Sequence, residues 1–142
     1  MNLVDQIIDY VIKHVGWDAL SDAGFRDQET LKQYISFQLI HQNLMYVLDP
    51  ETEAVTGVLI SYECGEDEAY ARFEWTVPNG KKCIFVAQIA VSDSDSLKLL
   101  AHGFLLRFKD KKTTVCVRRG TYTTMKAHDI AKRLLTQTEA SL

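Results

Sequence analysis

Hydrophobic residues in the first part of the chain recur at the three- and four-residue spacing of a helix. Over residues 3–15 they form one continuous stripe, made of Leu3, Val4, Ile7, Ile8, Val11, Ile12 and Val15. Only a helix presents such a stripe on one side, and Gly16 is expected to end it. Residues 17–25 are predicted to form a compact loop. Asp27 is a suitable N-cap for a second helix, which should stop near Asn43.

The hydrophobic period changes to two after this point, as in strands. Residues 43–49 and 54–63 predict two strands that pair as a hairpin around a turn at Pro50. Residues 69–77 alternate apolar and polar side chains from Ala71 onward, which is typical of a half-buried strand. The Asn79-Gly80 dipeptide favours a type I′ turn, so this strand should reverse directly into residues 81–91. The almost wholly apolar run from Cys83 to Val91 predicts a central strand covered on both faces.

The helical period returns in residues 94–108, where Ser94, Asp95 or Ser96 would cap the helix. Leu99 and Leu106 lie outside the main apolar face, so this helix is expected to be buried on two sides. Residues 113–117 predict a short strand, and residues 121–135 predict a last helix. The fold class is therefore α/β of the α+β kind: one domain over residues 1–142, with a mostly antiparallel sheet and a terminal β-α-β crossover.

Composition and charge narrow the classes of function. Lys and Arg number 16 against 19 Asp and Glu, a net charge of -3, so no overall basic field favours nucleic acid or a membrane surface. The three cysteines are widely spaced and the four histidines are scattered, which predicts a reducing compartment and no metal site. No signal peptide or membrane-spanning run is recognisable, so a cytoplasmic location is expected.

The order of elements resembles the core of the GNAT superfamily of acyl-CoA-dependent N-acyltransferases over roughly residues 27–135. In that family the long apolar strand binds the pantetheine arm, which would place Ala87, Ile89 and Val91 along an acyl-CoA or acetyl-CoA cofactor. The next helix start binds the pyrophosphate, which would involve Ser94 and Ser96. The glycine-containing Q/R-x-x-G-x-G/A motif of that loop is absent from residues 92–96.

Two acidic residues stand where the resemblance would put the pyrophosphate. Asp93 and Asp95 would repel it, and Asp and Ser side chains are good caps for the helix N–H groups that would bind it. These residues favour a degenerate cofactor site.

The resemblance also implies candidate catalytic residues. Tyr122 occupies the place of the general acid that many members carry on their last helix. Glu74 and Glu63 are candidates for the general base from the facing strands. The divergent toxin-activating lysine acyltransferases use an upstream His, for which His14 is available. They also use an Asp in the long strand, where this chain has Ala87 and Gln88, so that chemistry is not supported.

Two further features concern partners. Arg118 and Arg119 form a local basic pair that could bind a phosphate or an acidic partner. The amphipathic helix of residues 1–16 packs either on its own domain or against a second copy or larger assembly.

Two functions stay open from the sequence. The first is a non-catalytic binding or assembly protein, which associates with itself or with a protein partner. In this it resembles the small, motif-poor proteins of the same fold that tailed bacteriophages encode as virion or accessory proteins, which is an analogy at the level of the fold. The second is an N-acyltransferase that uses a CoA thioester. A continuous pairing of residues 87–91 with residues 113–117 would exclude the pantetheine arm, whereas a gap between them would accommodate it.

Overall fold

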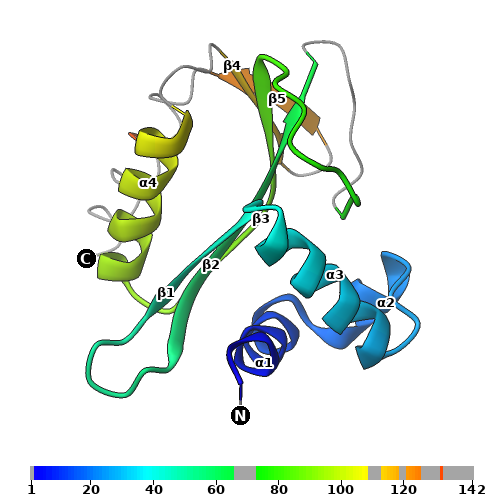
Figure 1. Ribbon diagram of the computed structural model, residues 1–142, viewed down its shortest axis with the longest axis vertical. Helices are drawn as coiled ribbons and strands as arrows, with labels where there is room; N and C mark the ends of the chain where they lie inside the picture. The colour runs from blue at the N-terminus through cyan, green and yellow to red at the C-terminus, as the bar shows by residue number, and fades with distance from the viewer. Residues whose placement is uncertain (1, 66–72, 109–112, 119–120, 126–131, 133–142) are drawn as a thin grey trace.

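The computed structural model shows an α+β fold, and it describes residues 2–65, 73–108, 113–118, 121–125 and 132. The elements follow the order α1 (Leu3–Val15), α2 (Trp17–Asp22), α3 (Gln28–Ile40), β1 (Leu44–Leu48), β2 (Val55–Cys64), β3 (Cys83–Val91), α4 (Ser94–Phe108), β4 (Thr113–Arg118) and β5 (Thr121–Met125). Helices α1, α2 and α3 lie on one side of the sheet and α4 lies on the other (Figure 1).

The first helices begin and end at residues that satisfy their terminal backbone groups. The Asn2 side chain accepts the Asp5 N–H before α1, and Gly16, with a φ of 90°, ends that helix as predicted. Asp27 caps α3 by accepting the Thr30 N–H at 2.8 Å, also as predicted. The expectation of a loop over residues 17–25 is wrong in part, because Trp17–Asp22 form the short helix α2, which buries Leu20.

The sheet has the strand order β1-β2-β3-β4-β5. Strands β1 and β2 form the predicted antiparallel hairpin, and the Asp49 carboxylate stabilises its turn by accepting the N–H groups of Glu51 and Thr52. Strand β3 pairs antiparallel with β2, and β4 pairs parallel with β3. Helix α4 lies between β3 and β4 in the chain, so the predicted β-α-β crossover is present.

The predicted hairpin of residues 69–77 with residues 81–91 is wrong. Residues 73–77 form no strand, and residues 69–72 lie outside the described part. The segment is instead held by side chains: Gln38 Nε2 donates to the Glu74 carbonyl at 2.8 Å, and Asn43 Nδ2 donates to the Thr76 carbonyl at 2.7 Å. Strand β2 takes the place beside β3 that the hairpin would have filled.

The end of the chain also differs from expectation. Residues 121–125, which were expected to begin the last helix, form β5, antiparallel to β4. The pattern Thr-Tyr-Thr-Thr favours a strand over a helix because β-branched and aromatic residues lose little freedom there. Of the remaining predicted helix only residue 132 is described, and it is helical.

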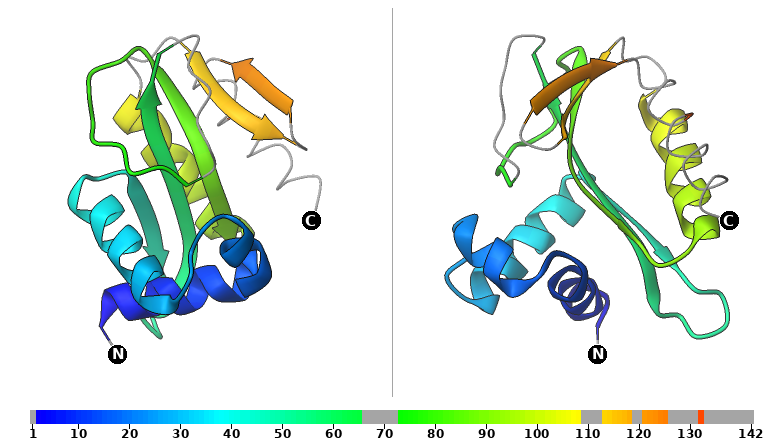
Figure 2. Two further views of the ribbon diagram at one scale, coloured as in Figure 1. Left: turned by 90° about the vertical axis from the view of Figure 1, so that its right-hand side faces the viewer. Right: turned by 180° about the vertical axis from the view of Figure 1, so that it is seen from behind.

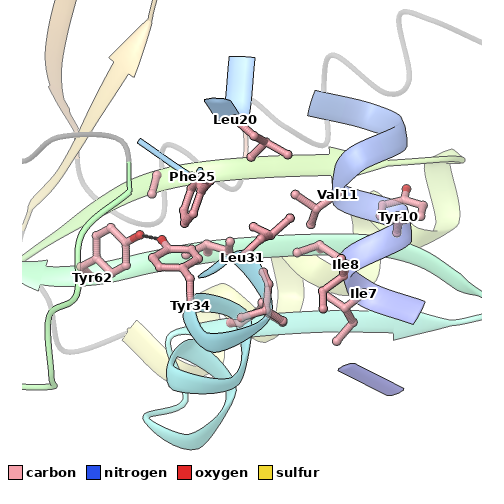
Figure 3. Packing of buried hydrophobic residues seen from close by; sticks show 14 of the residues in the cluster. Ile7, Ile8, Tyr10, Val11, Leu20, Phe25, Leu31, Tyr34 and Tyr62 are labelled. Carbon is pink, nitrogen blue, oxygen red and sulfur yellow. Dashed lines mark hydrogen bonds between the residues drawn. The ribbon is translucent and has the colours of Figure 1, made fainter. Parts of the chain in front are cut away.

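Two hydrophobic clusters lie on the two faces of the sheet. The larger joins α1, α2 and α3 to the sheet, with Ile7, Leu20, Leu31 and Tyr34 fully buried (Figure 3). The smaller joins α4 to the sheet through Leu100, Phe104 and Phe108. The apolar stripe of α1 thus packs on its own domain, which was one of the two expectations for it.

Helix α4 is buried on one side only. Leu99 and Leu106 are 59% and 76% exposed, so the expectation of burial on two sides is wrong for them. In the described part of the chain, no helix combines the length and the apolar character needed to cross a bilayer.

Candidate functional site: the second half of β3 and the start of α4

The pairing of β3 with β4 stops half way along β3. It runs from Cys83 opposite Thr113 to Val86 opposite Cys116. From Ala87 to Val91, β3 has no strand partner on this side among the strands that the structure describes, and the end of β4 diverges from it (Figure 2). Pairing of the parallel strands therefore ends at Val86 and Cys116, and β4 continues for two more described residues, Val117 and Arg118.

A β-bulge lies where the two strands part. Ile60 of β2 is opposite Gln88 and Ser61 is opposite Val86, so Ala87 is an extra residue on β3. A bulge bends its strand and increases the local twist, so it turns the second half of β3 away from β4. It also resets the alternation: Ala87 and Ala90 contact the cluster of α1–α3, whereas Ile89 packs on that of α4.

The backbone N–H and C=O groups of Ile89 and Val91 face the side of β3 that no described strand covers. The Ser92 N–H donates to the Thr56 carbonyl at 2.9 Å, and hydrogen-bonding residues alternate along an antiparallel pair. The backbone N–H and C=O groups of Ala90 and Gln88 therefore point towards β2. Those of Ile89 and Val91 point away from β2. The Gln88 Nε2 donates to the Ile89 carbonyl at 3.0 Å, so one of these groups is bonded within the chain.

Asp93 caps the N-terminus of α4. Its Oδ1 atom accepts the Ser96 N–H at 2.7 Å, so this carboxylate lies where an anion would bind the first turn. The Ser96 side chain is buried, and its hydroxyl donates to Thr56 Oγ1 at 2.8 Å. Both polar groups through which Ser96 could bind a pyrophosphate are thus used inside the fold. Ser94 is half-buried at the first position of the helix.

Tyr10 of α1, on the other face of the sheet, also bonds to residues beside the start of α4. Its hydroxyl donates to the Thr56 carbonyl at 3.0 Å and lies 2.9 Å from Ser92 Oγ. Burial raises the pKa of Tyr10, and the charge of Asp93 raises it further against the lowering effect of the Ser92 bond. Neither Tyr10 nor Thr56 was predicted from the sequence, because these residues are 46 positions apart and no local pattern links them.

The close approach of α4 to β2 depends on Gly57. A Cβ atom built at this position would lie 3.1 Å from Leu100 Cδ1 and 3.4 Å from both Ser96 Cβ and Val91 Cγ1. The contact with Leu100 is tighter than ordinary van der Waals contact, so any larger residue would require the side chains at the start of α4 and the end of β3 to shift. Gly57 thus sets how close the helix start lies to the second half of β3.

The two candidate bases take part in hydrogen bonds between β2 and the segment that follows it. The Glu63 carboxylate accepts the backbone N–H groups of Asn79 and Gly80. Glu74 lies in that segment, where its N–H donates to the Tyr62 hydroxyl at 3.2 Å. Neither observation links these carboxylates to the edge of β3 at Ile89 and Val91.

The remaining candidates lie on β4, β5 and α1. Tyr122 lies in β5, where it is paired with Val117 of β4 on the side of β4 opposite to β3. Arg118 is the last residue of β4, and Arg119 lies outside the described residues. The His14 ring packs on Tyr10, with ring centroids 4.1 Å apart.

Comparison with known proteins finds no relative: no family model matches the chain, and neither a curated protein nor a solved structure is significantly similar to it.

Proposed function

We propose that the protein is a non-catalytic binding protein on a GNAT-like scaffold, which holds an extended polypeptide segment along β3 and whose acyl-CoA site is degenerate. The observation that carries the proposal is the end of β3–β4 pairing at Val86 and Cys116. A strand edge with outward N–H and C=O groups binds an extended peptide by adding a strand to the sheet. Ile89 and Val91 supply these groups.

The GNAT-like part of the proposal is supported by the order of the elements. Helices precede an antiparallel β1-β2-β3 unit, and the crossover through α4 leads to a parallel strand that parts from β3. The β5 strand directly after β4 is a departure, because the resemblance implies a helix there.

The degenerate nucleotide site is supported by the start of α4. Coenzyme A carries a pyrophosphate, which needs helix N–H groups that are not already bonded. Here Asp93 accepts the Ser96 N–H, and Asp95 adds a second carboxylate in the first turn. An anion would have to displace a cap and approach two like charges at the same time.

Transfer of an acyl group from a CoA thioester to an amine is the second candidate. It is favoured by the same parting of β3 and β4, since a pantetheine arm also carries amide groups that bond to a strand edge. Tyr122 as general acid and Glu74 as general base stay predictions. So does an origin in a tailed bacteriophage.

Thermal unfolding of the full chain with millimolar acetyl-CoA, longer acyl-CoAs and pantetheine separates the two. A ligand at 100 times its Kd adds roughly 2.7 kcal/mol, which is a shift of several degrees. The binding-protein proposal expects no shift with the CoA esters, and light scattering on the same sample reports self-association. A saturable shift with acetyl-CoA would overturn the degenerate site and favour the transferase.

A further inference from the structure

Two cysteines stand directly opposite each other in the sheet. Cys64 is the last residue of β2 and Cys83 is the first residue of β3, and the register pairs them. Both are fully buried thiols in the cluster on the α1–α3 face, so their side chains are on the same side of the sheet. Directly opposed residues in antiparallel strands have Cα atoms about 4.5–5.5 Å apart, within the span of about 4.4–6.8 Å that a disulfide needs.

The pair stands at the two ends of the segment that leaves β2 and returns to β3. Part of that segment packs into the core, where the Phe73 ring lies 5.3 Å from Phe25 and 5.7 Å from Tyr34. A covalent bond at its base would close this segment into a loop. The third cysteine, Cys116, lies in β4 opposite Val86, so the register gives it no cysteine partner.

We propose that Cys64 and Cys83 form a reversible disulfide between β2 and β3, which locks the base of segment 65–82 when the surroundings become oxidising. With glutathione disulfide as the oxidant, the thiolate of one cysteine attacks a sulfur of glutathione disulfide and releases one glutathione. The other cysteine then attacks the mixed disulfide and releases the second glutathione. Two protein thiols are oxidised, one glutathione disulfide is reduced to two glutathiones, and the two thiol protons pass to the glutathione thiolates.

The test uses the full chain, refolded from denaturant in glutathione buffers that range from reducing to oxidising. Refolding lets the thiols react before they are buried, so slow access in the native state does not limit the result. After acid quenching and alkylation, intact mass and peptide mapping report the thiols lost and the cysteines joined. Wild type and the control C116S should each lose two thiols, and peptide mapping should find Cys64 joined to Cys83 in both. C64S and C83S should form no internal cross-link.

The oxidised wild type should also unfold at a higher temperature than the reduced protein, by roughly 5–10 °C for a loop of this length. Three results would overturn the proposal: a cross-link that includes Cys116, a mixed disulfide with glutathione that does not close, or three intact thiols in the most oxidising buffer. The peptide map of wild type decides between these outcomes even if C64S or C83S does not fold.

Discussion

Asp93 Oδ1 accepts the Ser96 N–H at 2.7 Å, and this bond places a carboxylate over the first turn of α4. The bond satisfies a helix N–H group that would otherwise lack a partner. It also keeps a negative charge at the site where the GNAT resemblance requires an anion. One side chain thus contributes both to the stability of α4 and to the proposed loss of nucleotide binding.

The capping role of Asp93 can be separated from its charge. Asp93→Ala should lower the free energy of unfolding by about 1 kcal/mol, whereas Asp93→Asn should cost little because Asn is an equally good cap. Asp95→Asn is the matched control, since it removes one charge from the same turn without touching the bond to Ser96. Urea unfolding measures the free energy of unfolding of all three variants. Equal losses for Asp93→Ala and Asp93→Asn would mean that charge and not capping matters.

The packing of α4 on β2 predicts opposite effects for two glycines. Gly57→Ala should destabilise the protein by about 1–3 kcal/mol, because its Cβ would meet Leu100, Ser96 and Val91 at the sheet. Gly103→Ala is the control within α4. Its Cβ would meet only the flexible end of Met45, at 3.3 Å, while alanine gains up to about 1 kcal/mol of helix propensity. Thermal or urea unfolding should therefore separate the two variants, and equal losses would contradict this account of Gly57.

Tyr10 should stabilise the junction of α1 with the end of β3. Tyr10→Phe removes the hydroxyl that bonds the Thr56 carbonyl and Ser92 Oγ, at an expected cost of about 1–2 kcal/mol. Ser92→Ala should cost less, because it leaves the bond from Tyr10 to Thr56 in place. The double variant Tyr10→Phe/Ser92→Ala tests whether the two residues act through one bond. If they do, its loss of stability should be smaller than the sum of the losses in the two single variants. Simple additivity would show that they act independently.

Buried tyrosine predicts a loss of stability at alkaline pH. Burial raises the pKa of Tyr62, whose hydroxyl lies beside Tyr34 (Figure 3) and accepts the Glu74 N–H. A raised folded-state pKa means that the stabilisation is fully present below the unfolded pKa of about 10 and is lost as the pH rises above it. The free energy of unfolding should therefore fall as the pH rises above about 10, and the fall should be shallower in Tyr62→Phe. An identical slope in the variant would assign the alkaline loss to other groups.

Local signals in the sequence predicted the parts of the fold that depend on neighbouring residues. Asp27 caps α3 and Gly16 ends α1, and each acts within one helical turn. The Asn79-Gly80 dipeptide is an equally local signal, and Gly80 does have a positive φ of 73°. The hairpin that it predicted fails because the partner of β3 is decided by the buried pairing with β2, across a segment of 18 residues between Cys64 and Cys83.

The candidate site was predicted only in part for the same reason. The apolar run of β3 and the acidic start of α4 are visible in the sequence, but the use of the Ser96 hydroxyl by Thr56 is not, because the two residues are 40 positions apart. The bulge at Ala87 is a property of two strands together. Neither residue type nor period indicates that β4 would leave β3 at that point.

The edge of β3 that no described strand covers predicts an alternating pattern of amide exchange. The N–H groups of Ala90 and Gln88 face β2 and should exchange slowly, whereas those of Ile89 and Val91 face away and should exchange faster at low protein concentration. Residue-resolved hydrogen exchange by NMR measures this directly. Because a polypeptide added to this edge would bond the same two groups, their exchange should slow when the protein is concentrated, if the occupant is a second copy. Uniformly slow exchange from Gln88 to Val91 in the dilute monomer would mean that the chain itself already covers the edge, and the proposed binding site would be lost.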